Sequence, residues 1–225
     1  MKKLFIFLTL SALFSLFFIG CSKVDPTPSE VKTVNTFSEF DEKYRRADYE
    51  AFLRDPSAFV KDLMAVSYNP SCPPEDVPVG DGWILDADNS EKSEDVSVQW
   101  YDKECVLFNK VFSYSADVFT FHKNNTCKYF IDLSYDSGDV QTNLSLAKSL
   151  YFCYVDLFGD PTEITIDEEN ASEPALLRIL DGTTEPQDFS VYFGDGKCIT
   201  FWAFARTWEG DGIYSSHLRF SAHDY

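Results

Sequence analysis

The chain has 225 residues and a formal net charge of −18, from 37 acidic and 19 basic side chains. Binding to nucleic-acid phosphates needs clustered lysine and arginine, so this balance excludes nucleic acid as a partner. The acidity either suits a cationic partner or keeps an exported protein soluble. The length is sufficient for one domain, or two small ones, with a sizeable core.

The first twenty residues have the features of a secretory signal peptide. Lys2 and Lys3 form a short basic region, and the apolar stretch 4–19 follows it. As a helix this stretch would rise about 24 Å, which is less than the roughly 30 Å hydrocarbon core of a bilayer. We therefore expect residues 1–20 to be a signal peptide that is removed.

The apolar stretch ends in Phe18-Ile19-Gly20-Cys21, which resembles the lipobox of bacterial lipoproteins. The resemblance covers residues 1–23. It implies that the chain is cut before Cys21, that this cysteine carries a diacyl group, and that the new amino terminus is acylated, for example with palmitate. Several acyl chains anchor a protein stably where one chain is marginal.

The resemblance thus predicts a lipid anchor at Cys21 in a bacterial cell envelope, at the outer membrane, on its periplasmic or its surface face. The alternatives are cleavage by the ordinary signal peptidase and an uncleaved anchor helix. Residues 21–35 are polar and contain Pro26 and Pro28, which is typical of a tether. Residues 36–225 are then expected to form a single α+β domain, with 36–140 and 141–225 as candidate halves.

Two helices are predicted at the start of this domain. The first begins at Thr36, because Thr36-Phe37-Ser38-Glu39 fits the capping box, in which a hydroxyl and a carboxylate each accept from a free amide. The second begins with Asp55 as N-cap and Pro56 at the first position, where a missing N–H costs little. The apolar residues at helical spacing are Phe37, Phe40, Tyr44 and Ala47 in the first helix, and Phe59, Val60, Leu63 and Met64 in the second.

Prolines at positions 70, 73, 74 and 78 predict irregular structure until about Val79. Residues 81–135 are then expected to form β-strands. In the segment 127–135 apolar side chains alternate with Asp132 and Ser134, which is the period of a half-buried strand. The other strands are predicted at 83–85, 96–101, 105–112 and 118–122.

A central helix is predicted over 144–158, with Thr142 or Asn143 as its cap. Gly159 should end the helix with a positive φ, and Pro161 prevents its resumption. Its apolar residues make a broad stripe, namely Ala147, Leu150, Tyr151, Tyr154, Val155 and Phe158.

More strands are expected after this helix, at 163–166, 176–180, 189–193, 197–206 and 212–222. The segment 198–205 is apolar on both faces and should be a central strand. Segments 119–130 and 191–201 share the same order of features: a predicted strand, a polar turn, a cysteine and then a phenylalanine. They suggest two related hairpins and a degenerate α-then-β duplication, although hairpins also converge on such patterns. The fold class is therefore α+β, with antiparallel sheets, two N-terminal helices and one central helix.

No catalytic, cofactor-binding or metal-ligating residue is nominated. The chain contains no HExxH, no G-x-S-x-G and no glycine-rich phosphate loop. Gly-Asp-Gly at 80–82, 194–196 and 210–212 is more typical of hairpin turns than of calcium loops. The stretch 86–90 begins like an EF-hand loop but lacks its glycine and closing glutamate, so an acidic surface loop is expected. His122 and Cys127 could form a Cys–His nucleophile, but the position of Cys127 is more typical of a core or disulfide cysteine.

The four tryptophans could form a sugar-stacking surface or serve the core. Trp202 lies in the two-sided apolar segment and is expected in the core. Trp208, beside Glu209-Gly210-Asp211, is the candidate ligand contact. The other two are Trp83 and Trp100.

The domain contains five cysteines, an odd number, so at least one is unpaired within the chain. Cys153 falls on the apolar helix and is expected to be free and buried. Cys127 and Cys198 occupy equivalent hairpin positions and could pair only if their strands are adjacent. Cys72, in the proline-rich segment, could move to meet Cys105.

Three classes of function remain. The leading one is a non-catalytic structural or interaction module of the envelope, attached to the membrane by its lipid anchor. The second is a binding protein for glycans or for a cationic protein, such as an inhibitor of a basic enzyme. The third is an enzyme whose site is assembled from scattered residues. A salt-sensitive complex with a basic protein would favour the second, and a deep pocket with converging polar groups the third.

Overall fold

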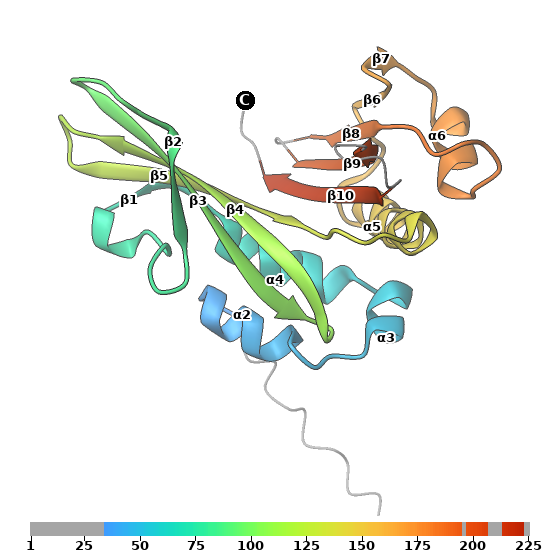
Figure 1. The fold of residues 1–225 in the computed structure, drawn as a ribbon, viewed down its shortest axis with the longest axis horizontal. Helices are drawn as coiled ribbons and strands as arrows, with labels where there is room; N and C mark the ends of the chain where they lie inside the picture. Colours follow the sequence, from blue (N-terminus) through green and yellow to red (C-terminus); the bar gives the residue numbers. More distant parts are fainter. Residues whose placement is uncertain (1–33, 195–196, 207–212, 223–225) are drawn as a thin grey trace, which may run out of the picture. The chain divides into compact units, whose positions relative to one another are not determined.

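The computed structural model describes residues 34–194 and, by their backbone, residues 197–206 and 213–222. Val34–Tyr225 form one compact unit, in which the described residues build two five-stranded antiparallel sheets. Helices precede the first sheet, and a central helix comes between the two sheets in the sequence (Figure 1). The α+β prediction is confirmed.

The first predicted helix is α2, Phe37–Tyr44, and its cap is the predicted one, since the Thr36 hydroxyl accepts from the amide of Glu39 at 3.2 Å. A short helix that was not predicted, α3, follows at Tyr49–Arg54, with its first amides capped by Asp48. Six residues are too few to show a helical period. The next helix, α4, spans Ser57–Ser67 and begins one residue later than predicted.

The first sheet has the strand order β1-β5-β4-β3-β2. The predicted strand 105–112 is wrong, because the chain reverses within it at Phe108 and Asn109, both with positive φ. A reversal of this kind makes a tight hairpin. The strands are β1 Tyr68–Cys72, β2 Ile84–Lys92, β3 Val96–Leu107, β4 Lys110–Phe121 and β5 Thr126–Ser134.

Two segments expected to be irregular are strands at the two edges of this sheet. Strand β1 contains Pro70, which is exposed, and β1 is bulged between Asn69 and Cys72. An edge strand tolerates proline because one row of its amides has no partner. The stretch 86–90 belongs to β2, with a register shift between Asp86 and Glu91, so it is not a free loop. A 3₁₀ turn, Pro74–Asp76, separates the two strands.

The central helix α5 spans Val140–Phe158 and is buried along most of its length. Asp139 is its cap, with a carboxylate oxygen that accepts from the amide of Gln141 at 3.1 Å, so the predicted caps Thr142 and Asn143 are wrong. The predicted end is confirmed, since Gly159 has φ 85°. Among the described residues, no helix is long and apolar enough to span a membrane.

The second sheet has the order β10-β9-β8-β6-β7, which confirms β9 as an interior strand. The predicted strand 176–180 is wrong and is helix α6, Glu173–Leu180. Its buried residues, Leu176, Ile179 and Leu180, have the spacing of one helical face. The strands are β6 Glu163–Ile166, β7 Glu169–Asn170, β8 Phe189–Phe193, β9 Lys197–Arg206 and β10 Ile213–Ala222.

Candidate functional site

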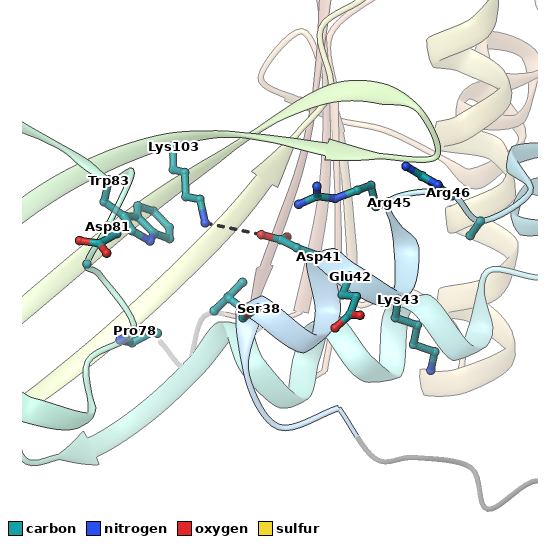
Figure 2. A pocket seen from close by; sticks show the side chains of 13 residues that line it. Ser38, Asp41, Glu42, Lys43, Arg45, Arg46, Pro78, Asp81, Trp83 and Lys103 are labelled. Carbon is teal, nitrogen blue, oxygen red and sulfur yellow. Dashed lines mark hydrogen bonds and ion pairs between the residues drawn. The ribbon is translucent and has the colours of Figure 1, made fainter.

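An open groove of about 1010 Å³ lies along α2 and the residues that follow it, and we call it the α2 groove. One wall is α2 with the residues that follow it, and the other is the loop 78–83 together with Lys103 of β3 (Figure 2). The lining residues carry both charges, and the charged ones are Asp41, Glu42, Lys43, Arg45, Arg46, Asp81 and Lys103.

The tip of the β3–β4 hairpin fixes the C-terminal end of α2. The amide of Phe108 donates to the carbonyl of Tyr44 at 2.7 Å, and the amide of Asn109 donates to the carbonyl of Arg45 at 2.9 Å. The last carbonyls of a helix have no partner within it, so the hairpin satisfies groups that would otherwise need water. Arg45 is therefore carried on a rigid support.

The opposite wall is built by the turn 80–82, where the predicted Gly-Asp-Gly turn is confirmed. The amide of Trp83 donates to the carbonyl of Gly80 at 3.1 Å, and Gly82 adopts φ 84°, which favours glycine. The turn leaves Trp83 half-buried, edge-on to the ring of Phe37 and stacked on Tyr114 with centroids 5.9 Å apart. This wall of the groove is therefore aromatic.

A tyrosine hydroxyl and a lysine ammonium group hold the carboxylate of Asp41. The Tyr114 hydroxyl donates to Asp41 Oδ1 at 2.7 Å, and Lys103 Nζ lies 3.5 Å from Asp41 Oδ2. Burial raises the pKa of Tyr114 far above its usual value. Burial, with Asp41 nearby, also raises the pKa of the Cys105 thiol to about 12. The buried groups behind Asp41, Tyr114 and Cys105, are thus neutral at ordinary pH, and Lys103 balances the charge of Asp41.

The rim of the groove carries two exposed guanidinium groups. Lys43 pairs with Asp62 at 2.5 Å, whereas Arg45 and Arg46 are exposed and have no ion pair within the described part of the chain. In the view of Figure 2, Arg45 extends along the groove toward the Asp41–Lys103 pair. Guanidinium groups bind carboxylates and phosphates through paired N–H donors. The rim can therefore receive an anionic group.

A second cavity, of about 440 Å³, lies between α5 and the α3–α4 junction. Cys153 lines it and is buried, as predicted, and it is a free thiol in this structure. Burial raises the pKa of this thiol to about 11, so the thiolate form is suppressed. Because the thiolate is the reactive form of cysteine, Cys153 is not an activated nucleophile here.

The two predicted site residues, Cys21 and Trp208, lie outside the described residues, and their roles remain predictions. Sequence reasoning missed the residues that meet in the α2 groove. Asp41 and Lys103 are far apart in the chain, and the one local signal was the Arg45-Arg46 pair in an acidic sequence. Within the described ranges, no cluster of histidine, cysteine and carboxylate side chains is arranged to hold a metal ion.

Comparison with known proteins identifies no relative of this chain. No protein-family model matches its sequence, and no curated protein or solved structure matches it. Any statement of function must therefore come from the groove and from the sequence.

Proposed function

We propose that the chain is a non-catalytic, lipid-anchored interaction module of a bacterial cell envelope, and that its α2 groove binds an anionic ligand. One observation carries the proposal. Two exposed arginines, Arg45 and Arg46, stand at the rim of an open, partly aromatic groove in a chain whose net charge is −18.

The shape and lining of the groove favour a glycan chain with isolated carboxylates. Enclosed pockets cover most of a small ligand, whereas an open groove contacts one side of an extended one. The guanidinium groups of Arg45 and Arg46 would donate hydrogen bonds to the carboxylates, and the half-exposed indole of Trp83 offers an apolar contact to a sugar ring. A densely charged polyanion would be repelled by the rest of the chain.

Titration calorimetry on the soluble Cys21→Ser form lacking residues 1–20 tests the groove. The ligands are a short, partly methyl-esterified oligogalacturonide, whose carboxylates are separated by uncharged sugars, and its fully methyl-esterified form, which has the same sugar chain without the charge. We expect only the charged form to bind, with an affinity that falls as salt is added. Arg45→Ala and Arg46→Ala should weaken binding, and Arg178→Ala, an exposed arginine on α6, should not. Equal binding of both ligands, or no binding, would contradict the proposal.

The location is proposed from Gly20-Cys21 and the polar tether that follows. Cells fed labelled palmitate should label the protein, because the resemblance places the acyl groups on Cys21. The Cys21→Ser variant should leave the membrane fraction. A wild-type protein that is soluble and carries no label would contradict the proposed location, and it would say nothing about ligand binding in the groove.

A second candidate partner, a cationic protein, is favoured by strand β2. It is the last strand of its sheet, it exposes Ile84 at 72% and Leu85 at 43%, and further along the same strand it exposes Asp88 and Glu91. An extended basic segment could add to such an edge. Binding of a lysine-rich peptide that Ile84→Lys abolishes and Arg45→Ala leaves intact would favour this partner over the anionic ligand.

A further inference from the structure

Two buried cysteines lie opposite each other on adjacent strands of the first sheet. Strand β1 pairs with β5 in antiparallel register, and Cys72 stands directly opposite Cys127. The pairing depends on the bulge in β1. A regular continuation from the pair Asn69–Tyr129 would place Thr126 opposite Cys72, and a shift of one residue turns a side chain to the other face. The bulge adds the residue that brings the two cysteines together.

The distance across such a pair suits a disulfide. Directly opposed residues of antiparallel strands have Cα atoms roughly 4.5–5.5 Å apart, with side chains on the same face. Disulfides occur at Cα separations of roughly 4.4–6.8 Å. A bond between Cys72 and Cys127 would therefore require little movement of the backbone.

The surroundings of the two thiols are closed to water. Cys72 is 4% and Cys127 2% exposed, and both are free thiols in this structure. Burial, with Cys127 close by, raises the pKa of Cys72. The hydroxyl of Thr120 lies 3.5 Å from Cys127 Sγ. A bond formed here would be shielded from reductants, which must reach a sulfur atom to attack it.

The other pairings that the sequence allowed are not available. Cys105 lies on β3, which is three strands from β1 in the sheet order, or roughly 14 Å at the usual strand spacing. Cys198 lies on β9, in the other sheet, and β9 is flanked by β8 and β10. The Cys72–Cys105 pairing is therefore wrong, and the adjacency that Cys127–Cys198 would need is absent.

We infer that Cys72 and Cys127 form a cross-strand disulfide in the exported protein, which fastens the edge strand β1 to β5. The inference rests on the proposed envelope location, because such bonds persist in oxidising compartments. One thiolate attacks the disulfide of an oxidised thiol–disulfide oxidoreductase and forms a mixed disulfide, and the second thiolate then attacks the cysteine sulfur of that mixed disulfide and releases the oxidoreductase as its thiolate. The two thiols lose two protons and two electrons, and the donor becomes two thiols. Because both sulfur atoms are buried in the folded state, the exchange takes place before β1 has docked.

Peptide mapping tests the bond directly. The Cys21→Ser form lacking residues 1–20 is refolded with oxidised glutathione, alkylated in denaturant and cut with trypsin without reductant. Lysines at 61, 92, 123 and 128 place Cys72 in peptide 62–92 and Cys127 in peptide 124–128. We expect these two peptides linked, with a mass two hydrogens below their sum. The other cysteines fall in peptides 104–110, 149–178 and 198–206. Alkylated Cys72 and Cys127, or a link to any of these peptides, would overturn the inference.

Melting with and without reductant gives a second readout. Reductant should lower the Tm of the refolded protein by roughly 5–10 °C, because the bond restrains the unfolded chain. The matched control Cys105→Ser should keep this shift, and Cys72→Ser and Cys127→Ser should lose it. An equal shift in all four proteins would overturn the inference. Exported wild-type protein, mapped in the same way, should also be linked. A link that forms in glutathione and is missing from cells would contradict the envelope location and leave the geometry supported.

Discussion

Helices α5 and α2 use their surfaces in opposite ways. α5 is buried on most of its circumference, with Leu150 and Tyr154 among its core residues. α2 buries the stripe of Phe37, Phe40 and Tyr44 and leaves the two arginines after it in solvent. The width of the apolar stripe decides which role a helix can have. A broad stripe makes a scaffold, whereas a narrow one leaves room for a polar face that can meet a ligand.

This difference implies that substitutions in the two helices should have different consequences. Changes to the buried face of α5 should alter the free energy of unfolding. Changes at the exposed end of α2 should leave that free energy nearly unchanged and alter binding. Asp41, which lines the α2 groove, and the buried Tyr114 and Cys105 near it should fall between these limits.

The largest effect is expected at Leu150, which is fully buried. Leu150→Ala should lower the free energy of unfolding by about 2–5 kcal/mol, because it removes apolar contacts and leaves a cavity. Denaturant unfolding measures the change. Ser145→Ala, at an exposed position of the same helix, is the control and should change little. Coincident midpoints for Leu150→Ala and wild type would mean that α5 is not the scaffold.

The next effect concerns pH and Cys105. Its folded-state pKa is raised from 9.0 to about 12, mainly by burial. The folded protein therefore holds this proton more tightly than the unfolded chain, and stability falls as pH rises from 9 toward 12. Because a shift of one pKa unit corresponds to 1.36 kcal/mol, the free energy of unfolding should fall by about 4 kcal/mol over this range. The free energy of unfolding, measured at several pH values across this range, should fall less steeply with pH in Cys105→Ala than in the wild type. The same dependence on pH in the two proteins would contradict the raised pKa of Cys105 in the folded state.

A smaller effect is expected from the hydroxyl that supports Asp41. Tyr114→Phe removes the 2.7 Å hydrogen bond and should cost about 1.5–3 kcal/mol, since the acceptor is charged. The control is Tyr49→Phe, because the buried Tyr49 hydroxyl has no hydrogen-bond partner within the described residues. That change should be neutral or slightly stabilising. If both variants lose the same stability, the Tyr114–Asp41 bond contributes nothing specific.

The smallest effect on stability is expected at the rim of the groove. Arg45→Ala and Arg46→Ala should each change the free energy of unfolding by less than about 0.5 kcal/mol, because both side chains are exposed and unpaired within the described chain. Denaturant unfolding and ligand titration on the same samples separate the two properties. A loss of stability as large as that of Leu150→Ala would place these arginines in the scaffold.

Local signals in the sequence were sufficient for the elements that carry their own caps and periods. Thr36 caps α2 and Gly159 ends α5, as the sequence pattern predicts. Strand β1 could not be read in the same way, because Pro70 is tolerated only at a sheet edge, and edges are set by distant pairing. At 176–180 the apolar run favoured a strand, although Pro174 at the start of α6 is a helix signal.

The two predicted hairpins are present as β4–β5 and β8–β9. Both candidate halves run from helix to antiparallel sheet, yet their strand orders differ. The candidate site could not be foreseen, because Asp41, Trp83 and Lys103 meet only after the first sheet has packed on α2. Sequence spacing reports neighbours along one element and not across elements.

NMR titration of the soluble Cys21→Ser form with the oligogalacturonide tests the α2 groove most directly. The indole N–H signal of Trp83, assigned with Trp83→Phe, and the amides of Arg45 and Arg46 should shift and reach saturation. The fully methyl-esterified ligand should leave these signals in place. Shifts confined to residues 84–92 of β2, or no shifts at ligand concentrations that saturate other carboxylate-binding proteins, would contradict the groove as the binding site.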